Sequence, residues 1–134
     1  MSKILIVCTS WYEDHLKKMI QISKTSLESE YDVQFLTAPG AIELAALAKN
    51  SLSKENFSGV LFLGIIMRGE TSHYDLVSQE TFRSIGSLAL EFPDKAFINN
   101  VICIENKTQL VERIEKNTLN NCNALKNLIH EKSC

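Results

Sequence analysis

The sequence has few residues that interrupt helices and strands, and it lacks the common patterns that bind nucleotides and nucleic acids. Only two of its 134 residues are proline and five are glycine, and no low-complexity tract or internal repeat occurs. It contains neither the Gly-x-Gly-x-x-Gly pattern of dinucleotide-binding proteins nor the Gly-Lys-Ser/Thr ending of a P-loop. A formal net charge of −2, without any basic cluster, argues against a nucleic-acid partner.

Long apolar runs and paired cysteine motifs are also missing. No run approaches the roughly 18 residues of a membrane span, and Ile4–Val7 is too short for the core of a signal peptide. None of the four cysteines forms a Cys-x-x-Cys pair or alternates with histidines (Cys8, Cys103, Cys122, Cys134). We therefore expect reduced thiols, no zinc site and a cytoplasmic protein. A content of 45% hydrophobic and 22% charged residues is typical of a globular protein, and the length fits one domain over residues 1–134.

Apolar runs of strand length alternate with amphipathic runs of helix length. Strands are predicted at Lys3–Cys8, Tyr31–Leu36, Val60–Met67 and Ala96–Ile104. Helices are predicted at Glu13–Glu28, from near Gly40 to Leu52, at Thr71–Leu90 and at Thr108–Lys116, followed by a last helix that packs Cys122, Leu125, Leu128 and Ile129. The third helix is expected to turn Tyr74, Val77, Phe82, Ile85 and Ala89 inward, and the asparagine-rich segment Asn117–Asn123 is expected to weaken the helix around it. This order predicts an α/β fold, with a four-stranded parallel sheet, right-handed crossovers and helices on both faces.

The apolar stretch Val60–Met67 indicates where a ligand would bind. Because it has no polar alternation, it predicts a strand covered on both faces, as in a parallel α/β sheet. Ligands in such sheets bind at the carboxyl ends of the strands, where the following helices begin. Three loops have that position in the predicted fold: Ser10–Tyr12, Pro39–Glu43 and Arg68–His73.

The loop Arg68–His73 combines two chemical features. The backbone N–H groups from Gly69 to Ser72 lack helical partners at the start of the predicted helix, so they form a candidate anion site. His73 lies in the same first turn, where the positive end of the helix dipole favours a neutral ring that can accept a proton. A purely structural histidine is the alternative interpretation.

Three other residues in these loops allow more than one interpretation. Trp11, the only tryptophan, either stacks on a planar heterocycle or fills the core. Glu43 either complements the dipole of the helix that it begins or accepts hydrogen bonds from the hydroxyls of a polyol. Arg68 is interpreted as an exposed salt-bridge partner or as an anchor of its loop.

Two of the loops carry a pattern that identifies a family. Pro39-Gly40-Ala41-Ile42-Glu43 is followed about 25 residues later by Arg68-Gly69-Glu70-Thr71-Ser72-His73. This pair, with the order and spacing of the elements over essentially the whole chain, resembles the 6,7-dimethyl-8-ribityllumazine synthases, which catalyse the penultimate step of riboflavin synthesis. Either half alone is a weak signal, whereas their combination is specific.

The resemblance implies a flavodoxin-like three-layer sandwich and a transferase that uses no cofactor and no metal. The implied reaction condenses 5-amino-6-(D-ribitylamino)uracil with 3,4-dihydroxy-2-butanone 4-phosphate, with loss of phosphate and water. The resemblance also implies a homopentamer whose active sites lie between neighbouring subunits. It leaves open whether the pentamers assemble further into a sixty-subunit shell.

The functional residues of the family can be carried over to matching positions. His73 is implied as the proton-transferring residue, and Trp11 as the aromatic that stacks on the pyrimidine ring. Glu43, bordered by Ala41 and Ile42, would hold the ribityl hydroxyls. The remaining implied contacts are Ile65 and Ile66 for the uracil, Gly69, Glu70, Thr71 and Ser72 for the phosphate, Arg113 for a neighbour's phosphate, and Asn99 and Asn100 for the wall of a neighbour's pocket.

The chain departs from the family pattern at four places. Tyr12 replaces a common asparagine, and Asn99 stands where many members have phenylalanine. Glu70 adds a negative charge beside the proposed phosphate site, where like charges repel. The segment Asn117–Asn123 replaces a Gly-x-Asn-Lys-Gly segment, so that Asn121 stands in the place of a lysine. This last change is expected to weaken phosphate affinity or to alter the contacts between pentamers.

These departures keep two alternatives to the transferase open. One is a non-catalytic flavodoxin-like protein that binds flavin or another ligand, with Thr9-Ser10 as a short version of a hydroxyl-rich phosphate loop. The other is a purely structural homologue that forms a shell.

Overall fold

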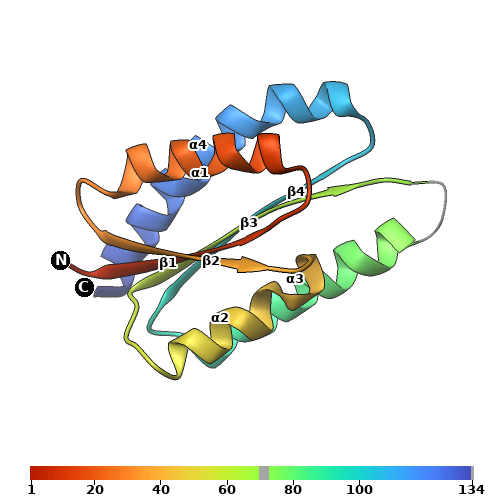
Figure 1. The fold of residues 1–134 in the computed structure, drawn as a ribbon. Coiled ribbons are helices and arrows are strands. Elements are labelled where there is room, and N and C mark those ends of the chain that lie inside the picture. The colour runs from red at the N-terminus through yellow and green to blue at the C-terminus, as the bar shows by residue number, and fades with distance from the viewer. Residues whose placement is uncertain (70–72, 134) are drawn as a thin grey trace.

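A computed structural model describes residues 1–69 and 73–133 of the chain. Strands and helices alternate along it, as the hydrophobic pattern predicts (Figure 1). The strands are β1 (Lys3–Thr9), β2 (Asp32–Ala38), β3 (Gly59–Met67) and β4 (Ala96–Ile104). The helices are α1 (Glu13–Leu27), the short 3₁₀ helix η1 (Ala41–Glu43), α2 (Leu44–Leu52), α3 (His73–Glu91) and α4 (Lys107–Ser133).

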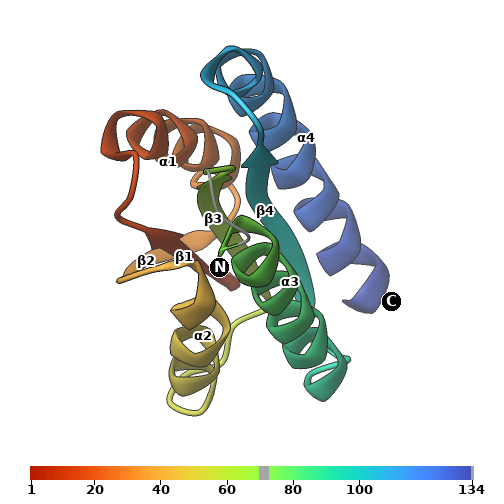
Figure 2. The same ribbon diagram turned by 90° about the vertical axis from the view of Figure 1, so that its right-hand side faces the viewer.

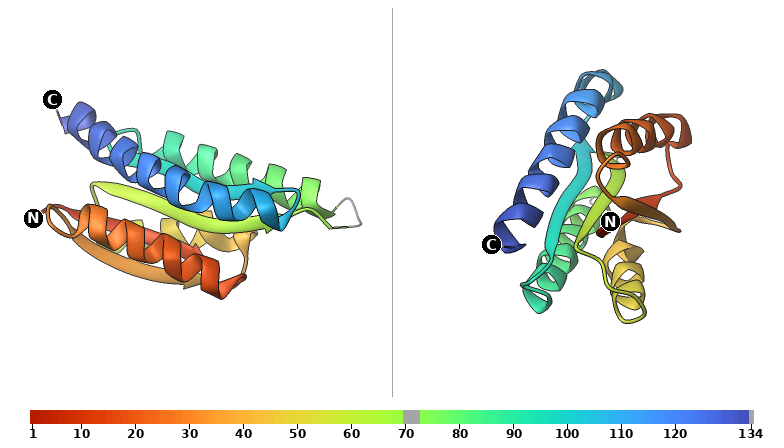
Figure 3. Two further views of the ribbon diagram at one scale, coloured as in Figure 1. Left: turned by 90° about the horizontal axis from the view of Figure 1, so that it is seen from above. Right: turned by 90° about the vertical axis from the view of Figure 1, so that its left-hand side faces the viewer.

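The four strands form one parallel sheet in the order β2-β1-β3-β4. Helices α1 and α4 lie side by side over one face, and α2 and α3 cover the other (Figures 2 and 3). This arrangement confirms the predicted three-layer α/β sandwich with a four-stranded parallel sheet. Within the described residues, no helix is both long and apolar enough to cross a membrane.

Strand β3 is buried on both faces, as its unbroken apolar sequence predicts. Its side chains alternate between the two helical layers. Those that join the core under α1 and α4 are Leu61, Leu63 and Ile65, and those that join the core over α2 and α3 are Val60, Phe62 and Ile66. Each layer therefore packs on the sheet through its own hydrophobic cluster, and β3 contributes to both.

Helix α3 turns most of the expected side chains inward: Ile85 is buried, and Tyr74 and Val77 pack against the core. Thr81, Ile85 and Leu88 are its buried residues, whereas Phe82, which was expected to face inward, is 45% exposed. Consecutive residues of an α-helix point about 100° apart, so the burial of Thr81 turns Phe82 away from the sheet.

Helix α4 is continuous, and the predicted division into two helices is wrong. The asparagine-rich segment Asn117–Asn123 lies within it without a break. Thr118, Cys122 and Leu125 are fully buried at helical spacing. This packing outweighs the weak helix propensity of the neighbouring asparagines.

A small polar network joins α4 to β4. Asn100 is only 2% exposed; its Nδ2 donates to Thr118 Oγ1 at 2.9 Å, and its Oδ1 accepts from Asn121 Nδ2 at 2.6 Å. The expectation that Asn100 lines a neighbour's pocket is therefore wrong, because its side chain is buried inside its own chain. Asn121, which replaces the family's lysine, is held in the same network.

We predict that Asn100→Ala destabilises the fold by about 2 kcal/mol, because it leaves the buried Thr118 hydroxyl and the Asn121 amide without their partner. Urea unfolding followed by circular dichroism measures this free energy. Asn120→Ala, at an exposed position of the same helix, is the matched control and should change stability by less than about 0.5 kcal/mol. Equal unfolding midpoints for the two variants would show that the network contributes nothing to stability.

Candidate active site

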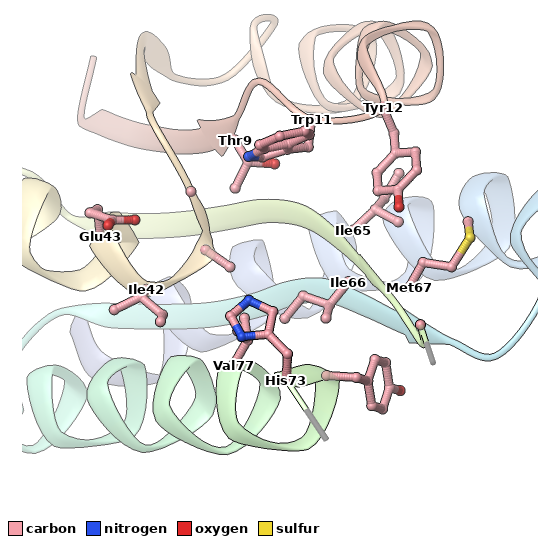
Figure 4. A pocket seen from close by; sticks show the side chains of 14 residues that line it. Thr9, Trp11, Tyr12, Ile42, Glu43, Ile65, Ile66, Met67, His73 and Val77 are labelled. Carbon is pink, nitrogen blue, oxygen red and sulfur yellow. The ribbon is translucent and has the colours of Figure 1, made fainter. Parts of the chain in front are cut away.

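The carboxyl ends of β1 and β3 open onto a pocket of about 360 Å³, bounded by η1 and the start of α3 (Figure 4). This is the edge of the sheet where ligands bind in parallel α/β folds. The pocket is lined by Thr9, Trp11, Tyr12, Gly40, Ala41, Ile42, Glu43, Ile65, Ile66, Met67, Gly69, His73, Tyr74 and Val77. Three segments that are distant in the sequence thus contribute to one site.

The loop after β1 supplies the aromatic side of the pocket. Trp11 is 63% exposed, so the interpretation of this residue as core filler is wrong. Its indole Nε1 donates a hydrogen bond to the carbonyl oxygen of Pro39 at 3.1 Å, which ties the first loop to the second. The ring is thereby held at the mouth of the pocket before any ligand arrives.

Tyr12 has an unusual backbone conformation at the start of α1. Its φ of 57° and ψ of 51° lie in the left-handed region, which asparagine tolerates better than tyrosine. The departure from the family's asparagine therefore places a disfavoured residue at a strained position. Its ring lines the pocket beside Met67 (Figure 4).

The loop after β2 supplies the carboxylate. Glu43 is exposed and immediately precedes α2, but its side chain makes no capping hydrogen bond to that helix. Figure 4 shows its carboxylate on the pocket side, near Ile42. A β-carbon on Gly40 would lie 2.9 Å from Glu43 Oε2, so glycine leaves room for the carboxylate at this turn.

The end of β3 and the first turn of α3 supply the imidazole. Ile65 and Ile66 are buried under the pocket, and His73 is exposed at the first described residue of α3. Figure 4 shows the His73 ring rising from α3 into the pocket beside Ile66. Glu43 at the end of η1 and His73 at the start of α3 thus line the same pocket.

Arg68 is an exposed salt-bridge partner, as one interpretation of the sequence proposed. Its Nη2 lies 3.1 Å from Asp75 Oδ1, and its Nε lies 3.5 Å from Glu105 Oε1. Its guanidinium also lies 4.6 Å from the centre of the Tyr74 ring, and its backbone N–H donates to the carbonyl of Ile104 at 3.0 Å. Exposed ion pairs stabilise little individually, but this set joins the end of β3 to α3 and β4.

The Tyr74 phenol, which also lines the pocket, stays protonated around neutral pH. Burial raises its pKa, and the neighbouring Cys103 side chain raises it further, against the opposing effect of Arg68. Tyr74 is therefore a neutral phenol and not a phenolate at this pH.

Several sequence-predicted residues do not line this pocket. Asn99 Oδ1 accepts a hydrogen bond from the backbone N–H of Val101 at 2.8 Å, and Arg113 Nη1 donates to the carbonyl of Cys103 at 2.9 Å. Asn99 lies on β4, on the face that α2 and α3 cover, and Arg113 lies on α4. The predicted phosphate contacts Glu70, Thr71 and Ser72 lie outside the described residues.

Sequence reasoning also missed part of the lining. Thr9, Tyr12, Met67, Tyr74 and Val77 line the pocket but were not named among the implied substrate contacts. Tyr74 and Val77 follow His73 by one and four residues on the same helix, so helical spacing could have pointed to them. For Thr9, Tyr12 and Met67 the signal was their position at strand ends and loops, which is weaker.

The arrangement suits a planar ligand with a polar chain. Apolar and aromatic side chains form most of the walls, while Glu43 and His73 supply a hydrogen-bond acceptor and a proton-transferring group. Among the described residues, no group of three or more histidine, cysteine and carboxylate side chains is arranged to hold a metal ion. Fold and site together define a flavodoxin-like α/β protein with a ligand-sized pocket at the carboxyl edge of its sheet.

Comparison with known proteins gives the family. Residues 1–130 match the family model described as 6,7-dimethyl-8-ribityllumazine synthase. The chain is 33% identical over 117 residues to the protein of that name from Novosphingobium aromaticivorans, covering 86% of this chain and 82% of the relative. It is 34% identical over 117 residues to the one from Erythrobacter litoralis, covering 86% and 81%. The chain belongs to the 6,7-dimethyl-8-ribityllumazine synthase family.

Proposed function

We propose that the protein condenses 5-amino-6-(D-ribitylamino)uracil with 3,4-dihydroxy-2-butanone 4-phosphate to form 6,7-dimethyl-8-ribityllumazine, the penultimate step of riboflavin synthesis. The observation that carries this proposal is that one pocket, in a chain of this family, brings together Trp11, Glu43 and His73 from three separate loops. We further propose that the enzyme works in the cytoplasm.

The pocket suggests how the ribitylaminouracil binds. Its pyrimidine ring stacks on the Trp11 indole, which the hydrogen bond to Pro39 already holds in place. The backbone at Ile65 and Ile66 borders the uracil. The ribityl chain extends past Ala41 and Ile42, and its hydroxyls donate to the Glu43 carboxylate.

The chemistry requires several proton transfers. The amine of one substrate attacks the ketone of the other and water leaves as the imine forms; phosphate is then eliminated, and ring closure releases a second water. His73 takes up and returns protons during these steps, and none of them requires a redox carrier. Binding both substrates in one pocket makes their encounter effectively intramolecular, which supplies much of the rate. In this proposal the phosphate lies at Gly69, Glu70, Thr71 and Ser72.

We propose that the site is completed by a second subunit in a homopentamer. The open pocket supports this, because Trp11 is 63% exposed and Ile42 is 45% exposed in the single chain. Arg113 of one subunit would then bind the phosphate in its neighbour's pocket, and Asn99 would form part of the wall. The family's lysine is replaced here by Asn121, which is neutral and whose amide is held by Asn100. We therefore assign the phosphate to Arg113, a cation on the same helix.

The direct test is to incubate the purified protein with both substrates and to follow the green-blue fluorescence of the lumazine product. We expect product to form without added metal or cofactor. Copurification of a yellow flavin with no turnover would instead support the non-catalytic flavin-binding alternative.

We predict that His73→Ala lowers kcat by about 100-fold, with little change in either KM, because general acid–base assistance is lost while the binding surfaces remain. Steady-state kinetics between pH 6 and 8 measure the effect. His130→Ala, near the exposed end of α4, is the matched control and should retain wild-type kcat. A His73→Ala enzyme with full kcat across this pH range would remove His73 from the mechanism.

We predict that Trp11→Ala raises the KM for the ribitylaminouracil by about 5- to 10-fold, and the KM for the butanone phosphate much less, because ring stacking is lost. Trp11→Phe retains an aromatic ring but not the hydrogen bond to Pro39, so its KM for the ribitylaminouracil should lie between those of wild type and Trp11→Ala. Since Trp11 is the only tryptophan, the ribitylaminouracil should also quench the emission of the wild-type protein. Unchanged emission at saturating substrate would count against the stacked geometry.

The shared site predicts that subunits complement one another. Arg113→Ala should raise the KM for the butanone phosphate, because a guanidinium fork suits phosphate oxygens. When His73→Ala and Arg113→Ala subunits are coexpressed, some interfaces combine a wild-type His73 with a wild-type Arg113 from the neighbour. Such mixtures, verified by mass spectrometry, should be more active than either parent.

A different result would assign Arg113 to its own chain. If the mixed assemblies show only the average activity of the parents, Arg113 does not act across an interface. Its hydrogen bond to the carbonyl of Cys103 would then be its whole role, and Arg113→Ala would lower stability and leave the KM unchanged.

A further inference from the structure

The hydroxyl of Thr9, the last residue of β1, is buried without a partner. The residue is 3% exposed, and its Oγ1 makes no hydrogen bond with any described residue. Buried polar groups are nearly always paired in folded proteins, so an unpaired one calls for an explanation. Thr81 Oγ1 on α3 is in the same condition, which provides an internal comparison.

The side chain of Thr9 faces the layer that holds the pocket. Alternation along β1 puts Thr9 on the same face as Leu5 and Val7, which pack in the core over α2 and α3. On the neighbouring strand, a β-carbon at Gly64 would lie 3.4 Å from Thr9 Cγ2 and 3.6 Å from Thr9 Oγ1. Because residue 64 is glycine, no side chain of β3 covers the threonine at this point.

Thr9 also lines the pocket, whereas Thr81 does not. Figure 4 shows Thr9 next to the Trp11 ring, at the β1 end of the pocket. A ring stacked on Trp11 would therefore have one of its edges near Thr9. A threonine hydroxyl is both a donor and an acceptor, so it can pair with a ring carbonyl or with a ring N–H.

We infer that the Thr9 hydroxyl is a substrate-binding group, which forms a hydrogen bond with the polar edge of the pyrimidinedione that stacks on Trp11. The inference rests on the proposed function and adds to it a contact that selects for a heterocycle with a carbonyl or N–H at that edge. A ring without such a group leaves the hydroxyl unpaired and binds more weakly.

The test compares Thr9→Val, which removes the hydroxyl and keeps the shape of the side chain, with Thr81→Val. We expect Thr9→Val to raise the KM for the ribitylaminouracil by about 10-fold or more, with a much smaller change in kcat and in the KM for the butanone phosphate. Thr9→Ser, which keeps a hydroxyl, should stay within about 3-fold of wild type. Thr9→Ala, which also lacks the hydroxyl, should reproduce the loss.

Thermal unfolding of the ligand-free proteins separates binding from folding. Both valine variants lose an unpaired buried hydroxyl, so both should unfold at the same temperature as wild type or a few degrees higher. Only Thr9→Val should also lose affinity, because only Thr9 lines the pocket. This contrast excludes a general effect of threonine-to-valine replacement in the core.

The outcomes distinguish this inference from the proposed function. If the wild type forms lumazine and the KM values of Thr9→Val equal those of wild type, the hydroxyl does not bind substrate and the inference is wrong. If Thr81→Val raises the same KM equally, the effect is structural and the inference is again wrong. If the wild type forms no lumazine, the proposed function fails first, and the inference fails with it.

Discussion

The burial of β3 on both faces is the constraint on which the rest of the structure depends. A strand without polar alternation must be covered by a helical layer on each side, and the side chains of β3 belong to both hydrophobic cores. Strand β3 pairs in parallel with β1 and β4. This parallel pairing brings the carboxyl ends of the strands to one edge of the sheet. The pocket lies at that edge because the loops after β1, β2 and β3 meet there.

The scaffold holds the groups of the site in place before a ligand binds. The Trp11 indole is tied to Pro39, and Arg68 joins the first turn of α3 to the end of β4. These contacts fix the Trp11 indole and connect the end of β3 to the first turn of α3, which carries the imidazole. Such preorganisation suits a reaction whose rate comes largely from positioning two substrates.

Much of the fold follows from the sequence, because the hydrophobic pattern reports burial directly. The bounds of β4 were predicted to the residue, and the three loops of the site were located by the rule for parallel sheets. The two errors in the helices arose where tertiary packing outweighs local sequence preference. Asn100 and the core keep α4 helical through its asparagines. On α3, Thr81 takes the inward position that was expected for Phe82. Whether the Thr9 hydroxyl has a hydrogen-bond partner depends on the positions of neighbouring side chains, which hydrophobic periodicity does not report.

The central claim is that the pocket at the carboxyl edge binds the ribitylaminouracil between Trp11, Glu43 and His73. A crystal structure of the protein with this substrate bound tests it most directly. The account predicts the pyrimidine ring stacked on the Trp11 indole, one polar edge at Thr9, and the ribityl hydroxyls at Glu43. A ring bound away from Trp11, or a ribityl chain directed away from Glu43, would contradict the account.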